Sequence, residues 1–164
     1  MDDTDFHALY ERHARDVARF AYYLCGDRSQ AEDLAAEAFA RAWIALEEVR
    51  AATMKAYLFA IVRNIARQNA RREARRTEID AREPDRRPGP ASVAGDRLEL
   101  EATLAALQRL PESDRAVLLM RAQDGLSHEE IAAALGLSVV AVRAKVHRAR
   151  LALHAWKIQQ ERKP

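Results

Sequence analysis

The chain has 164 residues, enough for one ordinary domain or two small ones. Its composition, 49% hydrophobic and 32% charged with 5 glycines and 5 prolines, excludes a collagen-like chain and favours a helical globular protein. The formal net charge is only +2, so the distribution of charge is more informative than its total. Arginines gather between Arg63 and Arg87 and again between Arg143 and Arg150, which predicts two separate basic patches.

Cysteine and histidine usage gives no sign of a metal site or an enzyme. The single cysteine, Cys25, has no partner for an intrachain disulfide, and the five histidines are scattered without ligand spacing. We therefore expect no cofactor, no metal and no catalytic residue. The first residues are acidic, unlike a secretory signal, and no apolar run is long enough to cross a bilayer. We expect a cytoplasmic protein without membrane insertion.

The first half of the chain has the periodicity of three helices. Apolar residues recur at three- and four-residue steps over residues 6–24, which predicts the first helix. Ser29 and Glu32 have the spacing of a capping box and predict the start of a second helix, which continues to about Leu46. A third helix is expected over residues 53–76. No strand pattern is found anywhere in the sequence.

A stretch poor in apolar residues separates the two halves. Residues 78–97 consist mainly of Asp, Arg, Pro, Gly and Ser, a composition typical of a linker. A functional loop inside one domain is the alternative, but a structureless stretch of this length argues against a single compact core. We therefore predict an all-α protein with two small helical domains, residues 1–77 and 98–164, joined by a flexible linker.

The second domain has the spacing of a helix-turn-helix unit. Ala132 lies four residues before Gly136, and Val142 six residues after it, which suits two short helices crossing at a steep angle. Ser138 is expected to cap the second of these helices. Its outward face would present to duplex DNA the residues Ser138, Val140, Arg143, Ala144, His147 and Arg148. The alternative is that these arginines merely solvate a terminal helix.

The third predicted helix has a basic face that also carries an aromatic residue. At 100 degrees per residue, an angle that follows from about 3.6 residues per turn, one side collects Tyr57, Asn64, Arg67, Gln68, Arg71 and Arg75. Arginines can follow a phosphate backbone, amides can bind base edges, and a tyrosine can stack on a base, as single-stranded DNA requires. From the residues alone, a solvated face is equally compatible with this pattern.

Several segments resemble the extracytoplasmic function group of the sigma-70 family of bacterial RNA polymerase sigma factors. Residues 31–43 resemble the polymerase-binding segment of that family, and residues 57–66 with the following arginines resemble its promoter-melting helix. Residues 107–111, 117–119, 125–132 and 142–150 resemble its second DNA-binding domain. The order of the segments and the intervening linker also match, so the resemblance covers nearly the whole chain outside the linker and the termini.

The resemblance implies a sigma factor that binds core RNA polymerase, directs it to specific promoters and helps to open the DNA. The first domain would bind the clamp helices of the beta-prime subunit and would read and melt the minus-ten element. The second domain would read the minus-thirty-five element as duplex, and the beta flap and an anti-sigma factor would be further partners. The polymerase contacts would lie on the outward face of the second helix, at Asp33, Ala36, Glu37 and Ala40.

Five positions depart from the family pattern, and two other classes of protein compete with this interpretation. Family members usually have glutamine in place of Ala36, tryptophan in place of Tyr57, and larger aliphatic residues in place of Ala35, Ala38 and Ala40. A stand-alone helix-turn-helix regulator would bind its operator without polymerase. An enzyme would need convergent acid, base or metal groups, which the sequence lacks.

Overall fold

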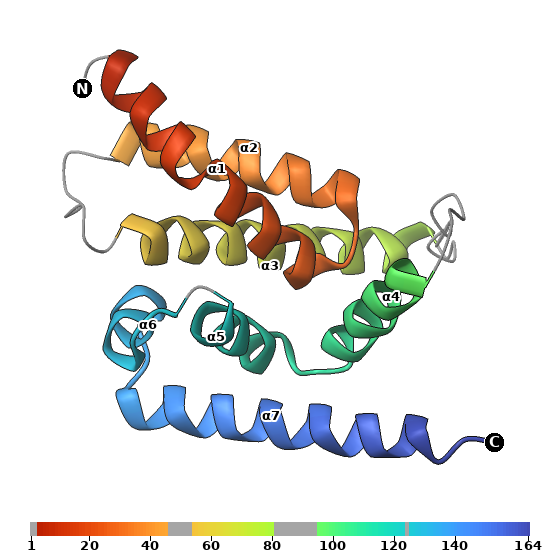
Figure 1. The fold of residues 1–164 in the computed structure, drawn as a ribbon. Helices are drawn as coiled ribbons and strands as arrows, with labels where there is room; N and C mark the ends of the chain where they lie inside the picture. The colour runs from red at the N-terminus through yellow and green to blue at the C-terminus, as the bar shows by residue number, and fades with distance from the viewer. Residues whose placement is uncertain (1–2, 46–53, 81–94, 124) are drawn as a thin grey trace.

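The computed structural model describes residues 3–45, 54–80, 95–123 and 125–164, and all regular structure in them is α-helical (Figure 1). The helices are α1 (Asp3–Cys25), α2 (Arg28–Ala45), α3 (Met54–Asp80), α4 (Gly95–Gln108), α5 (Glu112–Ala122), α6 (His128–Leu135) and α7 (Val139–Glu161). The predicted all-α class is confirmed. Helices α3 and α4 extend into the predicted linker from both sides, and residues 81–94 lie outside the described part of the chain.

Helices α1, α2 and α3 pack against one another as a three-helix unit around an aromatic core. Phe20 of α1 and Phe59 of α3 are both fully buried, and their rings stack with centroids 4.3 Å apart and an interplanar angle of 11°. Leu34 of α2 is also buried and is part of the same apolar cluster. Apolar faces at helical spacing thus form the core, as the periodicity predicted.

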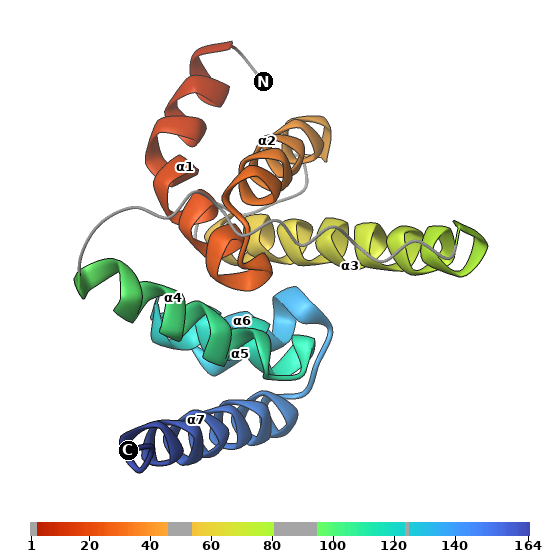
Figure 2. The ribbon, with the colours of Figure 1, turned by 90° about the vertical axis from the view of Figure 1, so that its right-hand side faces the viewer.

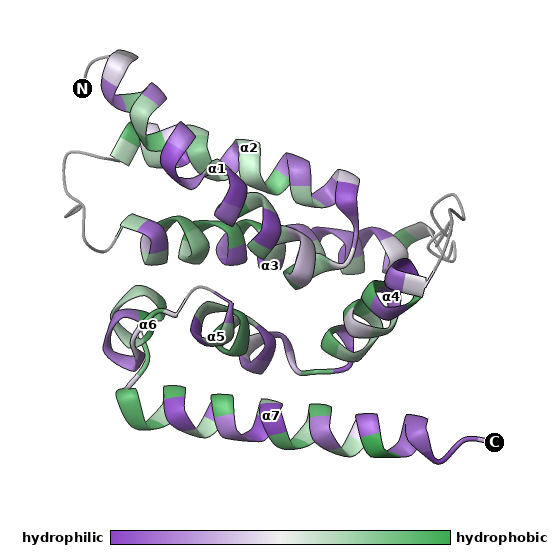
Figure 3. Cartoon of the chain, in the orientation of Figure 1, coloured by the Kyte–Doolittle hydropathy of each residue, from purple (hydrophilic) through white to green (hydrophobic). Residues whose placement is uncertain are grey.

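The two ends of α3 differ in character. Its first half is mostly buried, whereas the residues from Ala70 to Ile79 are all exposed. Figure 3 shows the matching change in hydropathy, from hydrophobic to mainly hydrophilic along the helix. Figure 2 shows that this second half projects beyond α1 and α2. The basic residues after Arg71 therefore lie on a part of α3 that solvent surrounds.

Side chains next to the N-termini of α6 and α2 determine where these two helices begin. Ser127 begins α6 with the predicted capping box, because its hydroxyl accepts from Glu130 N at 3.0 Å and the Glu130 carboxylate accepts from Ser127 N at 2.7 Å. The predicted cap of α2 at Ser29 is wrong. The helix begins at Arg28, and the carboxylate of Asp27 accepts from Gln30 N at 2.7 Å, so Asp27 occupies the capping position.

Helices α6 and α7 form the predicted helix-turn-helix. Gly136 ends α6 in the left-handed conformation with φ 66°, which glycine adopts without the penalty of a Cβ atom. The hydroxyl of Ser138 then accepts from Ala141 N at 3.1 Å and caps α7. Val142 is fully buried on the inner side of α7, as predicted. This tight turn holds the opposite side of α7 toward solvent.

The two halves of the chain lie against each other (Figures 1 and 2). Helices α4 and α5 contact α1, and helices α5 and α6 contact α3. Most of the buried apolar residues of both halves belong to one continuous cluster. The helix-turn-helix half is therefore docked on the three-helix half in this structure.

Candidate nucleic-acid and polymerase interfaces

A polar groove runs between α2 and α3 and encloses about 360 Å³. Its lining residues are Arg41, Ala45, Tyr57, Ile61, Asn64, Arg67, Gln68 and Arg71. Five of the six residues predicted on the basic face of α3 are among them, and Arg75 lies farther along the same helix, exposed. We call this feature the α2–α3 groove.

The α2–α3 groove combines cations, amides and one aromatic ring. Tyr57 is partly buried, whereas Asn64, Arg67 and Gln68 are exposed. Arg41 crosses from α2 to donate to the Gln68 side-chain oxygen at 3.4 Å. Such a surface offers a ring for stacking, amides for base edges and guanidinium groups for phosphates.

Three residues of this groove were not identified from the sequence: Arg41, Ala45 and Ile61. Arg41 also pairs with Glu37, four residues earlier on α2, so one carboxylate predicted to contact polymerase is engaged within the chain. Periodicity places residues on the face of a single helix and does not show which faces of two helices meet. The signal available in the sequence was the position of Arg41, four residues after the acidic residue at position 37.

A second surface is the outward side of α7. Val140, Arg143, Ala144 and His147 are all exposed, and Val140 retains 76% of its surface. Val142, Val146 and Ala149 on the opposite side are buried against the rest of the domain. The major groove of B-DNA is wide enough to admit an α-helix. Ser138 and the first backbone N–H groups of α7 lie at the N-terminus of this helix, the end that favours a phosphate.

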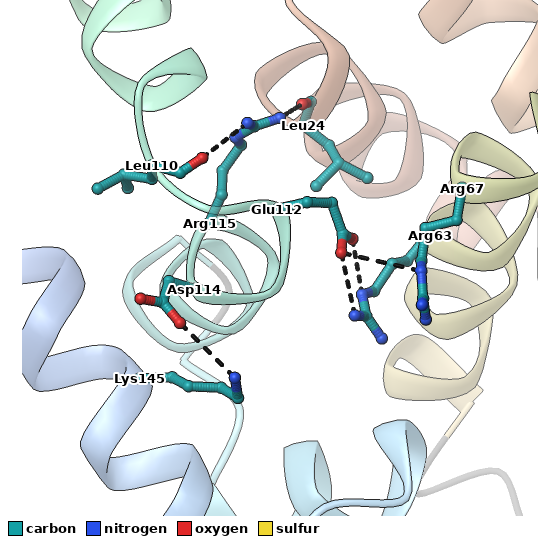
Figure 4. A network of polar contacts seen from close by, with 8 residues as sticks. All are labelled: Leu24, Arg63, Arg67, Leu110, Glu112, Asp114, Arg115 and Lys145. Carbon is teal, nitrogen blue, oxygen red and sulfur yellow. Dashed lines mark hydrogen bonds and ion pairs between the residues drawn. The ribbon is translucent and has the colours of Figure 1, made fainter. Parts of the chain in front are cut away.

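Arg148 lies on the same outward side but has a partner inside the protein. Its Nη2 and Nε atoms lie 3.1 and 3.3 Å from the two carboxylate oxygens of Asp114, which belongs to α5. Lys145 Nζ lies 3.7 Å from the same carboxylate (Figure 4). The hydrogen bond from Arg148 to Asp114 raises the pKa of the guanidinium. Two cations of α7 are thus held by one buried carboxylate.

An apolar groove of about 470 Å³ lies between α1 and α2. Its lining residues are Phe6, Tyr10, Ala14, Ala18, Glu32, Ala35, Ala36, Phe39 and Ala40. Of the four residues predicted to contact polymerase, the structure brings Ala36 and Ala40 into this groove. Asp33 and Glu37 are exposed on the same helix but do not line it. We call this feature the α1–α2 groove.

A network of polar contacts joins the two halves (Figure 4). Glu112 at the start of α5 accepts from Arg63 of α3 at 2.7 and 3.0 Å, and Arg67 lies 4.0 Å from the same carboxylate. Arg115 donates to the carbonyl oxygen of Leu24 at 2.7 Å and to that of Leu110 at 2.9 Å. Burial lowers the pKa of this guanidinium. The end of α1 and the middle of α3 are both tied to α5.

The remaining titratable groups with shifted pKa values do not converge on a pocket. Burial, together with Arg12 and Lys55, lowers the pKa of His13. A hydrogen bond from Lys55 lowers the pKa of Asp16, and burial raises the pKa of the Cys25 thiol. Within the described ranges, no cluster of His, Cys, Asp and Glu has the arrangement of a metal site. None of the described helices is long and apolar enough to cross a membrane.

Comparison with protein families gives two matches in chain order. Residues 9–76 match Sigma-70 region 2, and residues 100–153 match Sigma-70 region 4. The RNA polymerase sigma factor NccH of Alcaligenes xylosoxydans xylosoxydans is 32% identical over 162 residues, which cover 94% of this chain and 87% of that protein. The extracytoplasmic function sigma factor EcfG of Rhodopseudomonas palustris is 33% identical over 141 residues, which cover 83% of this chain and 76% of that protein. The chain belongs to the extracytoplasmic function sigma factors. This sigma factor directs RNA polymerase to promoters, as the sequence predicted.

Another relative and two solved structures agree with this family. The extracytoplasmic function sigma factor SigE of Mycolicibacterium smegmatis is 36% identical over 90% of this chain, which spans only 60% of that relative. The sigma factor RpoE in complex with the anti-sigma factor NepR from Bartonella quintana superposes with a TM-score of 0.78 at 25% identity, covering 92% of this chain and 95% of that one. CnrH in complex with the cytosolic domain of CnrY superposes with a TM-score of 0.74 at 30% identity, covering 96% of this chain and 90% of that one.

Proposed function

We propose that this sigma factor uses the α2–α3 groove for the single-stranded minus-ten element and the outward side of α7 for the duplex minus-thirty-five element. The observation that carries the first assignment is the convergence of Tyr57, Asn64, Gln68 and three arginines on one groove. The corresponding domains are residues 1–77 and 98–164. Arg75 extends the cationic path along α3 beyond the groove.

The groove has a physical task in promoter opening. Separating base steps costs a mean of about 1.4 kcal/mol each, and the factor must offset this through binding. Stacking an extruded base on an aromatic ring returns roughly 1 to 3 kcal/mol. Tyr57 would provide the ring, while the arginines would hold the phosphates on either side. RNA polymerase would supply the rest.

We assign polymerase binding to the α1–α2 groove and the exposed carboxylates beside it. Ala36 and Ala40 leave the groove open and apolar, while Glu32 and Asp33 give its edge a negative charge, and Glu37 beside them pairs with Arg41. The clamp helices of the beta-prime subunit would lie there. An apolar hollow of about 430 Å³ lined in part by Leu107, Leu118 and Leu153 would receive the beta flap.

We further propose that the chain acts as a non-catalytic subunit in the cytoplasm and has an anti-sigma partner. The family consists of transcription initiation factors, whose polymerase and DNA are in that compartment. The RpoE and CnrH structures, each in complex with a partner protein, support the last of these proposals.

Run-off transcription tests the assignment. Core polymerase with this chain should start transcripts from a promoter library, and the absence of new transcripts would contradict the function. The double variant Asn64→Ala with Arg71→Ala should reduce permanganate reactivity at the melted region while duplex protection upstream persists. Arg72→Ala is the matched control, because Arg72 is exposed on α3 outside the groove. Equal loss in the control would point to a nonspecific charge effect.

Membership of the sigma factor family argues against the stand-alone regulator, whose helix-turn-helix would resemble that of α6 and α7. Footprinting of the chain alone and with core polymerase separates the two. Full protection without polymerase would favour the regulator.

A further inference from the structure

Asp114 is a buried carboxylate on a helix that lies behind the predicted DNA-reading face. Its residue exposure is 5%, and it lies in the first turn of α5. A buried charge is tolerated only when it is paired and hydrogen-bonded. Both oxygens of Asp114 are engaged, and the cations that engage them, Arg148 and Lys145, come from α7. The Asp114 carboxylate therefore contacts side chains of α7, the helix whose opposite side faces solvent.

The contact uses only one edge of the Arg148 guanidinium. Asp114 accepts from Nε and Nη2, and the Arg148 side chain is still 60% exposed. A guanidinium carries five N–H donors in a rigid planar fork, so donors on its other edge stay available. Fixing one edge of a flat group also fixes the direction of the other. The Arg148 fork is thus oriented before any ligand arrives.

We infer that Asp114 is a positioning residue that orients Arg148 for bidentate contact with a base of the upstream promoter element. This inference rests on the proposed role of α7 in reading duplex DNA. An arginine presents two parallel donors to guanine O6 and N7 in the major groove, and such a contact depends on the angle of the fork. Lys145 Nζ, 3.7 Å from Oδ1 of Asp114, adds a second positive charge beside the same carboxylate.

Two other roles of Asp114 lead to different results. As a purely structural link between α5 and α7, it would affect all α7 contacts alike. As a competitor for Arg148, it would weaken DNA binding, and its removal would tighten it. A positioning role predicts a loss confined to the base that Arg148 reads.

The test is a double-mutant cycle in the full-length chain bound to bacterial core polymerase, with a pool of promoter fragments carrying a randomised upstream element. Asp114→Asn should lower the preference at one base position roughly 5- to 150-fold, the range of a good bidentate contact. In an Arg148→Ala background, the same substitution should change that preference less than about two-fold, because the two act through one contact. Glu129→Gln, an exposed acid in the first turn of α6, is the matched control.

The cycle also separates this inference from the proposed function. Equal losses in both backgrounds, or tighter binding by Asp114→Asn, would overturn the positioning role. If Arg148→Ala has no effect while Arg143→Ala does, α7 still reads DNA and the inference fails alone. If neither has an effect, the proposed reading by α7 fails with it. Should Asp114→Asn lower the melting temperature, Asp114→Glu keeps the charge and should retain the base preference in the folded protein.

Discussion

Replacing Glu112 by glutamine should shift this sigma factor toward a form in which its two halves are undocked. Glu112 joins them through two hydrogen bonds with Arg63, whose side chain is only 10% exposed. Hydrogen bonds to charged groups contribute about 1.5 to 3 kcal/mol. Glu112 itself is 36% exposed, so we take about 2 kcal/mol as the loss. This corresponds to roughly a thirty-fold shift toward the undocked form.

Two measurements report the shift. Small-angle X-ray scattering should show a larger radius of gyration. Cys25, the only thiol of the chain, should react faster with a thiol reagent. It lies next to Leu24, and the carbonyl oxygen of Leu24 accepts hydrogen bonds from Gln108 and Arg115 of the second half. Glu101→Gln serves as the control, since Glu101 pairs with Arg97 on its own helix. An unchanged scattering curve and thiol rate would mean that apolar contacts alone maintain the docking.

Three further predictions concern stability, each measured by urea or thermal unfolding. Ser127→Ala removes the capping box of α6 and should cost about 1 kcal/mol, whereas no loss would show that the turn is held by packing alone. Phe59→Ala empties the stacked core beside Phe20 and should cost about 3 to 5 kcal/mol, and a loss below 1 kcal/mol would argue against this core. Because the pKa of His13 is lowered in the folded chain, stability should fall as the pH drops through the unfolded value near 6.5. His13→Gln should flatten this dependence, and an unchanged slope would place its cause elsewhere.

The parts of the fold that depend on local sequence could be predicted. The capping box at Ser127, the left-handed Gly136 and the cap at Ser138 each act within a few residues, and all three have the expected form. At α2, two acceptable caps lie close together, and the sequence pattern favoured Ser29 where the structure uses Asp27. Competing local solutions of this kind have similar free energies, so a pattern alone does not separate them.

Contacts between distant residues could not be predicted. Arg148 was placed correctly on the outward side of α7, but its partner Asp114 is 34 residues away in sequence. Arg41 entered the α2–α3 groove through the packing of two helices. Helical periodicity assigns each side chain to a face, and only the tertiary packing decides which faces meet. The site residues on single helices were therefore accessible from sequence, and the charge pairs across helices were not.

The docked arrangement of the two halves also limits how far apart two DNA elements can be if one molecule is to contact both. By their names, the minus-ten and minus-thirty-five elements lie roughly 25 base pairs apart, on the order of 85 Å along B-DNA at about 3.4 Å per base pair. A compact chain of 164 residues has a radius of gyration of about 15 Å, so halves docked through Arg63 and Glu112 are too close together to span that distance. On the proposed assignments, recognition of a complete promoter would require the two halves to undock. Polymerase would then hold the two halves apart at the distance between the minus-ten and minus-thirty-five elements.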